Sequence, residues 1–291
     1  MVYALTVVAA LVVATGEVIQ QRSASQAPPE DNLSPKLLLW LVQRPRWLAG
    51  VACSLVGNLA FATAVGKGGV VLVEAVFAIR LVFGLTIAAV WRWHRIPRRD
   101  VASALLLTLG LIAFIVAARP HGSGIAVPDL RWAYGAGSGV AFAILLAVVA
   151  ARLPAPRKAL LLGMAAGTLF GIQASLVQSA VHVLTGPGIV ALLTGWHPYA
   201  VIVVALLGLL LVQSAFEVEP LTASYPGVVT FQLLSAIAIG VFVLGGVLRA
   251  QLPYAGVLAA ALVAMLVGMV ALGRSPLVTG QHGRDSRARS R

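Results

Sequence analysis

Apolar stretches about as long as a lipid bilayer is thick dominate this sequence. The hydrocarbon layer is about 30 Å thick and a helix rises about 1.5 Å per residue, so one crossing takes roughly 20 residues. Hydrophobic residues make up 60% of the 291 residues and charged residues only 10%, whereas about a quarter of the residues in a soluble domain are charged. The sequence therefore predicts an all-α integral membrane protein and excludes a water-exposed globule.

Clusters of charge, proline and glycine divide the apolar sequence into nine predicted transmembrane spans. The longest connection contains a polar, proline-bearing stretch, residues 23–34, which predicts a flexible loop. Residues 274–291 are polar and basic and predict a disordered cytoplasmic tail. The nine spans are residues 2–20, 47–65, 69–91, 101–118, 132–151, 159–181, 198–216, 226–247 and 253–273.

The basic residues predict the orientation, because short loops rich in lysine and arginine stay in the cytoplasm. With the N-terminus outside, only Lys67, Arg119, Arg131 and Arg249 fall in outer segments, and the other loop lysines and arginines fall inside. The net charge of +12 is then explained by topological anchors that contact anionic membrane lipids, without nucleic acid. The first apolar run could instead be a cleaved signal peptide, although no lysine or arginine precedes it.

Short similarities between the two halves predict an inverted repeat. Span two carries a polar residue followed by a small residue and Phe61, and span seven repeats this pattern up to Phe216. Spans one to four (residues 1–118) then match spans six to nine (159–273), and span five (132–151) is a linker. A repeat displaced by five crossings, an odd number, has to be inverted.

Several of these stretches resemble a known group of membrane proteins. They are Gln20-Gln21-Arg22, Phe170-Gly171-Ile172-Gln173, and Trp196-His197-Pro198-Tyr199 leading to Gln213-Ser214-Ala215-Phe216. Together they resemble the drug/metabolite transporter superfamily, specifically its EamA-like and NIPA-like members. The resemblance covers nearly the whole chain in hydropathy and implies a helical transporter fold. The NIPA-like resemblance implies nine spans and a divalent cation substrate such as Mg²⁺.

Charged residues inside the spans are the first candidates for a functional site, because burying an ion near the bilayer centre costs at least about 2.5 to 3.5 kcal/mol. Arg80 lies near the middle of span three, and Glu74 lies six positions earlier. That spacing places them about 120° apart on the helix, so each needs a partner on another helix. Arg80 either binds an anionic group of the substrate or belongs to a fixed ion pair. Glu74 either carries a coupling proton or is a static partner of an arginine.

The remaining candidates are Glu17 and four amides. Glu17 lies near the inner end of span one, where it is either a solvated helix end or a partner of Arg80. Gln20 and Gln173 occupy equivalent places in the proposed repeat, which predicts that they line a central site. Asn58 and Gln213 are hydrogen-bonding candidates that join helices, and Gln178, Gln232, Glu217 and Glu219 are further possible partners.

Small residues and tryptophans supply packing predictions. Gly163, Gly167 and Gly171 recur every fourth residue, as do Gly256, Ala260, Ala264 and Gly268. Such spacing lets helix backbones approach closely, either inside the bundle or at a homodimer seam. The tryptophans near span ends, among them Trp47, Trp132 and Trp196, are interpreted as interfacial anchors.

No catalytic pattern is present in the sequence. There is no nucleotide-binding loop, GxSxG elbow or HExxH motif, and the single cysteine, Cys53, excludes a disulfide or a CxxC motif. We therefore expect no enzyme activity, cofactor or metal centre. The sequence predicts a secondary transporter of the plasma membrane that moves a small polar or charged metabolite by alternating access. The alternatives are a divalent cation (Mg²⁺) transporter and a non-transporting scaffold or accessory subunit of envelope assembly.

Overall fold

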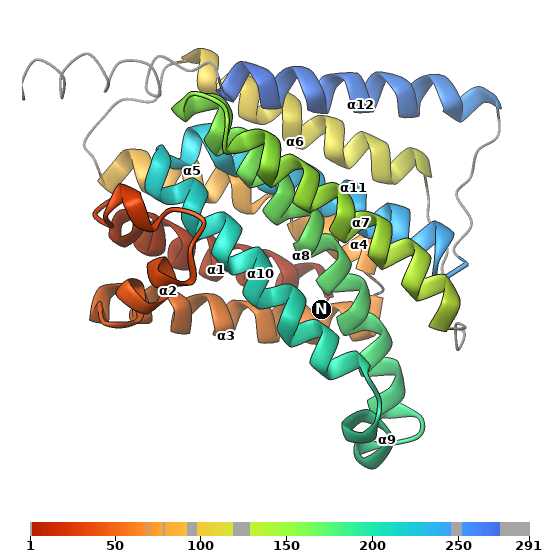
Figure 1. Ribbon diagram of the computed structural model, residues 1–291. Coiled ribbons are helices and arrows are strands. Elements are labelled where there is room, and N and C mark those ends of the chain that lie inside the picture. The colour runs from red at the N-terminus through yellow and green to blue at the C-terminus, as the bar shows by residue number, and fades with distance from the viewer. Residues whose placement is uncertain are drawn as a thin grey trace, which may run out of the picture.

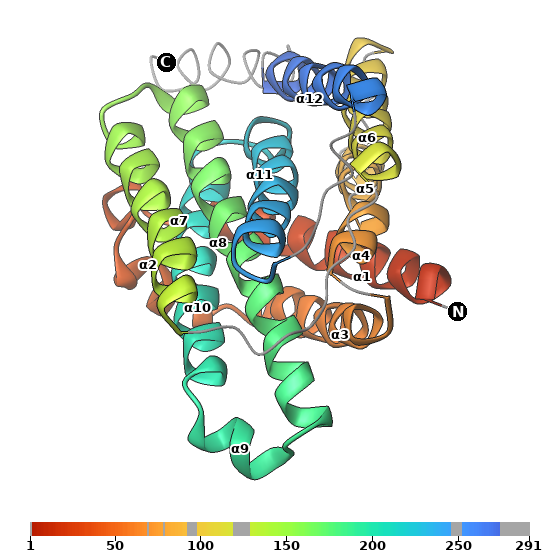
Figure 2. The ribbon, with the colours of Figure 1, turned by 90° about the vertical axis from the view of Figure 1, so that its right-hand side faces the viewer.

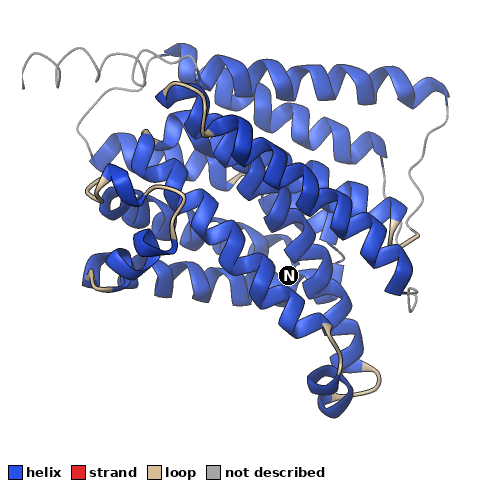
Figure 3. Ribbon diagram, in the orientation of Figure 1, coloured by secondary structure: helices blue, strands red, loops and turns tan. Residues whose placement is uncertain are grey.

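Helices form all the regular structure in the part of the chain that the computed structural model describes, residues 2–68, 70–77, 79–91, 98–118, 129–245 and 252–273 (Figures 1 and 3). The predicted tail, 274–291, lies outside these residues. In order, the elements are α1 (Val2–Ala24), η1 (Pro29–Asp31), α2 (Pro35–Val42), α3 (Pro45–Gly68), α4 (Val70–Phe77), α5 (Arg80–Trp91), α6 (Arg98–Ala118), α7 (Asp129–Ala150), α8 (Ala155–Thr185), α9 (Ile189–Thr194), α10 (His197–Val218), α11 (Leu221–Phe242) and α12 (Leu252–Gly273).

Within the described residues, six helices are long and apolar enough to cross a membrane: α1, α3, α7, α8, α10 and most of α11. Many of their large hydrophobic side chains are exposed, such as Leu59 at 72% and Leu145 at 58%. Soluble monomers rarely expose large contiguous apolar areas. The chain is therefore a multi-pass, all-α membrane protein, as predicted, whereas the count of nine spans goes further than these six helices and stays a prediction.

Two predicted elements differ from the structure. The third span, 69–91, is divided into α4 and α5, and Arg80 is the first residue of α5. The stretch predicted as a flexible loop, residues 23–34, contains η1, and α2 follows it within the same connection. Ser34 caps α2 by accepting a hydrogen bond from the Lys36 amide at 3.3 Å, and Leu37 and Leu41 of α2 are fully buried. Serine at the N-cap and proline at the first helical position favour a helix start, which explains this short helix.

This connection is also fixed to the end of α10. Asn32 donates hydrogen bonds to the carbonyl of Ser214 and to the Glu217 carboxylate, and the amide of Leu33 donates to the Ser214 hydroxyl. The sequence predicted no such contact, because these residues are more than 180 positions apart in the chain. The segment between α1 and α3 thereby covers one end of the helices that surround the polar interior.

Helix α8 lies at the centre of the fold and packs against α7, α10 and α11 (Figure 2). Its contact with α11 is the closest, because Gly163, Gly167 and Gly171 lie directly against the backbone carbonyls of Ser224, Val228 and Gln232. A Cβ atom at any of the three glycines would overlap these carbonyl oxygens. The prediction that this glycine face packs inside the bundle is confirmed.

The corresponding prediction for α12 holds only in part. Gly268 faces α6, where an added Cβ would lie 2.8 Å from the Ser103 carbonyl oxygen, but Gly256 has nothing within 4 Å and is exposed. Helix α12 instead presents Ala261 and Met265 to Gly110 of α6. The packing face of α12 is therefore rotated from the one that its small residues predicted.

Candidate functional site

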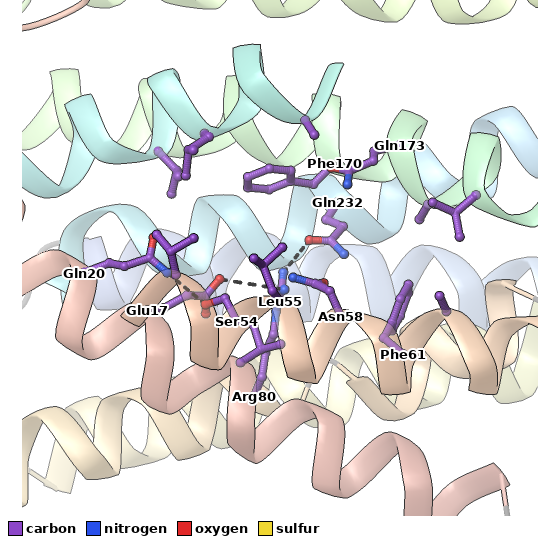
Figure 4. Close-up of a pocket in the computed structure, with 18 of the residues that line it drawn as sticks. Glu17, Gln20, Ser54, Leu55, Asn58, Phe61, Arg80, Phe170, Gln173 and Gln232 are labelled. Carbon is purple, nitrogen blue, oxygen red and sulfur yellow. Dashed lines mark hydrogen bonds and ion pairs between the residues drawn. The ribbon is translucent and has the colours of Figure 1, made fainter. Parts of the chain in front are cut away.

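A cavity of about 220 Å³ lies between α1, α3, α8 and α10, with α5 and α11 contributing one polar residue each (Figure 4). Five of the seven predicted site residues line it. Glu74 and Gln213 do not line it, but each is hydrogen-bonded to a residue that does. The polar residues of the wall are Glu17, Gln20, Ser54, Asn58, Arg80, Gln173 and Gln232, and the apolar ones include Val13, Val51, Leu55, Phe61, Phe170, Ala205, Leu209 and Phe216.

Arg80 is the central cation of the site and is only 4% exposed. Its Nη1 lies 3.9 Å from Oε1 of Glu17, and its Nη2 donates a hydrogen bond to Oε1 of Gln232. The guanidinium carbon lies 4.6 Å from the centre of the Phe77 ring, within cation–π range. Figure 4 shows the guanidinium reaching the cavity between Glu17 and Gln232. Its Nε has no hydrogen-bond partner among the described residues.

Gln232 of α11 joins the cation to the second carboxylate. Its Oε1 accepts from Arg80, and its Nε2 donates to Oε1 of Glu74 at 2.8 Å. An amide suits this place because it carries an acceptor and donors on one planar group. Glu74 of α4 and Arg80 of α5 do not share one helix as predicted, but each takes a partner from another helix, because both hydrogen-bond Gln232 of α11. Gln232 was foreseen only as a possible partner, and it proves to be the bridge of the cluster.

Tyr225 of α11 completes the cluster by donating its hydroxyl hydrogen to the Glu17 carboxylate. Its ring is fully buried and lies against Gly84, where an added Cβ would be 2.8 Å from Tyr225 Cε1. The absence of a side chain at Gly84, one turn beyond Arg80, thus makes room for the tyrosine. The Glu17 side chain is 12% exposed, so Glu17 is a largely shielded partner of Arg80 and not a solvated helix end.

A series of side-chain hydrogen bonds runs along the α1 and α3 side of the cavity. Trp47 Nε1 donates to Gln213 at 3.2 Å, Gln213 Nε2 donates to Gln20 at 2.6 Å, and Gln20 Nε2 donates to the Ser54 hydroxyl at 2.8 Å. Gln20 also donates to the carbonyl of Gly50 at 3.2 Å. This series of hydrogen bonds connects α3, α10 and α1 and fixes the Gln20 amide in the cavity wall.

The structure corrects the interpretation of two tryptophans as interfacial anchors. Trp47 is 3% exposed because its indole packs inside and hydrogen-bonds Gln213. Trp132 is 2% exposed and meets Trp196 edge to face, with ring centres 5.9 Å apart. A tryptophan near a predicted span end looks the same in sequence whether it faces headgroups or another helix, so hydropathy could not separate the two.

The site thus holds two carboxyl groups, one guanidinium and several amides. The part of the chain that the structure describes contains no group of three or more His, Cys, Asp or Glu residues that could hold a metal ion. These groups can hydrogen-bond and exchange protons with a polar solute. Fold and site together define a multi-pass, all-helical membrane protein with a charged cavity between its helices.

A relative in Corynebacterium glutamicum, "Uncharacterized protein Cgl0250/cg0304", is 30% identical over 266 residues, which cover 91% of this chain and 92% of the relative. The chain belongs to the same family as that protein. No protein-family model matches the chain, and no solved structure matches it.

Proposed function

We propose that this protein is a secondary transporter that moves a small polar or charged metabolite across the plasma membrane by alternating access. The observation that carries the proposal is the cavity itself. Arg80 and Glu17 lie 3.9 Å apart in its wall, which amide side chains also line. Ionisable groups inside a membrane are expensive and usually mark substrate or ion pathways. A fold that needed only helix packing would gain nothing from a cavity lined by them.

The charges of Glu17, Glu74 and Arg80 support coupling to protons. The two ionised carboxylates and the one guanidinium have a net charge of −1, and one bound proton makes the group neutral. The Arg80–Glu17 contact of 3.9 Å is longer than the about 2.7 to 2.9 Å of a charge-assisted hydrogen bond. Protonation of Glu17 would weaken this contact further and leave Arg80 to an anionic group of the substrate.

The proposed topology has nine crossings, with α4 and α5 as one divided span, the N-terminus outside and the C-terminus inside. The helix pairing is consistent with two inverted four-helix units. Helix α1 packs on α3 and α5 as α8 packs on α10 and α11, and α6 packs on α12. Exchanging the two units maps these pairs onto one another, with α7 as the linker. We propose on this basis that the family is a distant branch of the drug/metabolite transporter superfamily.

Two alternatives account for fewer of the observations. A Mg²⁺ transporter needs several oxygen ligands around the ion, but here Arg80 lies between the two carboxylates and would repel a divalent cation. A scaffold or accessory subunit needs close helix packing but not the cavity.

The test is a flux screen in proteoliposomes that contain the purified protein and carry a proton gradient. Metabolites and ions are compared with protein-free vesicles, and the solute that moves is measured again with Arg80→Ala, Glu74→Gln and Glu17→Gln. We expect each variant to slow flux by about tenfold or more, because an interaction with a charged group is worth about 1.5 to 3 kcal/mol. The matched control is Glu30→Gln, because Glu30 lies exposed in η1. If no solute moves faster than in empty vesicles, or if the three site variants transport as well as the control, the proposal is wrong.

A further inference from the structure

The cavity opens towards one side of the helix bundle, between α3 and α10. Residues that α1, α5 and α11 contribute to the wall are buried or nearly so, with Arg80 4% and Gln232 5% exposed. On α3, by contrast, Leu55 is 64% exposed and Asn58 is also exposed, although both line the cavity. Helix α3 packs mainly on α1, and α10 mainly on α8, without an extensive contact between α3 and α10. The mouth of the cavity therefore lies between these two helices.

The mouth lies halfway along both helices. Leu55 and Asn58 are near the middle of the 24 residues of α3, and Ala205 and Leu209 are near the middle of the 22 residues of α10. Both helices are long and apolar enough to cross a membrane. The middle of such a helix lies at the depth of the acyl chains, and not at the depth of the water.

The surface around the mouth is apolar. Beside it, Val56 and Leu59 of α3 are 65% and 72% exposed, and Ile202 and Leu206 of α10 are 55% and 54% exposed. Large hydrophobic side chains on both sides suit a contact with hydrocarbon. An apolar chain could pass between them from the bilayer without meeting water.

The inner end of the cavity has the opposite character. Arg80 lies there, its Nε has no hydrogen-bond partner among the residues that the structure describes, and its contact with Glu17 is long at 3.9 Å. The volume of about 220 Å³ is smaller than the ~300 to 1,000 Å³ of a pocket that encloses a drug-sized ligand. The cavity therefore encloses a small charged group and leaves the rest of a larger molecule outside.

From this arrangement we infer the substrate class of the proposed transporter: an amphiphile with an anionic headgroup that binds Arg80 and an apolar chain that leaves through the mouth between α3 and α10 into the bilayer. The inference rests on the proposed function and adds a lateral route of entry. Leu55, at the rim, contacts the chain, and the Arg80 guanidinium donates hydrogen bonds to the headgroup.

The test compares two phosphate monoesters that differ only in their chain. The full protein is placed in phosphatidylcholine nanodiscs, and binding of radiolabelled dodecyl phosphate and methyl phosphate is measured, with protein-free discs as background. Arg80→Gln should weaken the binding of both probes. Leu55→Trp, which fills the mouth, should weaken binding of dodecyl phosphate by roughly tenfold or more through lost apolar burial and leave methyl phosphate unchanged. Leu145→Trp is the matched control, because Leu145 is an exposed leucine of α7, a helix that contributes no residue to the cavity wall.

If Arg80→Gln does not fold, two tests of the inference remain. They are Arg80→Lys, which keeps the positive charge, and the comparison of Leu55→Trp with its control variant. Equal affinity for the two probes, or Leu55→Trp binding dodecyl phosphate as Leu145→Trp does, overturns the inference and points to a soluble anion. If Leu55→Trp dissociates a dimer and Leu145→Trp does not, a second copy covers the mouth and the inference is also wrong. In all these cases, flux of a soluble solute that depends on Arg80 would still support the proposed transport function. If neither soluble solutes nor dodecyl phosphate are moved, the proposed transport function itself is wrong.

Discussion

Replacing Gly167 of α8 with alanine tests how closely the central helices approach. An added Cβ would lie 3.0 Å from the backbone nitrogen of Gln232 and from the carbonyl carbon of Val228, and closer still to the Val228 oxygen. These are backbone atoms of α11, which cannot rotate away as a side chain could. Gly167→Ala therefore has to push α8 and α11 apart, and Gln232 moves with α11.

The magnitude follows from two opposing terms. Alanine in place of glycine favours a helix by about 1 kcal/mol, and forcing an extra carbon into a packed interior costs typically about 1 to 3 kcal/mol. Gly137 of α7 is the matched control, because nothing lies within 4 Å of a Cβ placed there. Gly137→Ala carries only the first term, so Gly167→Ala should be about 1 to 3 kcal/mol less stable than Gly137→Ala. The intrinsic helix preference cancels in this difference.

The assay is reversible unfolding of the two variants in mixed micelles with increasing sodium dodecyl sulfate. The free energies of unfolding are compared, together with the flux of whichever solute the screen identifies. We expect Gly167→Ala to lose both stability and flux and Gly137→Ala to lose neither. Equal free energies of unfolding in the two variants would refute the close approach of α8 and α11, and with it the argument that places Gln232 between Arg80 and Glu74.

Three further substitutions are expected to lower the free energy of unfolding, each for a different reason. Trp47→Phe leaves the side-chain amide oxygen Oε1 of Gln213 without its donor and should cost about 1 to 3 kcal/mol; a melting temperature equal to that of the parent would contradict the hydrogen bond. Tyr225→Phe removes the donor to Glu17 and should cost a similar amount, about 1 to 3 kcal/mol, and also slow flux. Gly188→Ala imposes a side chain on a residue with φ of +99° and ψ of −176° in open space, a conformation that is essentially restricted to glycine. About 1 to 3 kcal/mol of backbone strain should therefore appear in thermal unfolding, with flux unchanged.

The sequence identified the charged members of the site because an ion inside an apolar run is costly wherever its helix packs. Arg80, Glu74 and Glu17 are visible on that ground alone. The hydrogen-bond partners of these charged residues were not visible in the sequence, because Gln232 is 152 residues from Arg80 and Tyr225 is 208 residues from Glu17. Hydropathy places a residue along a helix, but it does not tell which face of one helix meets which face of another.

The glycine patterns show the same limit in packing. Small residues permit two helices to approach but do not force them together, since lipid covers an apolar face as well as another helix does. The glycine face of α8 packs on the α11 backbone at Ser224, Val228 and Gln232. In α12, by contrast, a different face contacts α6 near Gly110. Which small-residue face is used depends on the partner, and a single sequence does not name the partner.

The close packing and the charged cluster depend on one another in this fold. Gly167 and Gly171 lie against the backbone nitrogen and oxygen of Gln232, the residue whose side chain connects Arg80 to Glu74. Without side chains at these two glycines, α11 comes near enough to α8 for its amide to be held in one position between the cation and the anion. A substitution that widens this contact should therefore disturb the charges of the cavity even when every charged side chain is still present, because the bridging amide has moved.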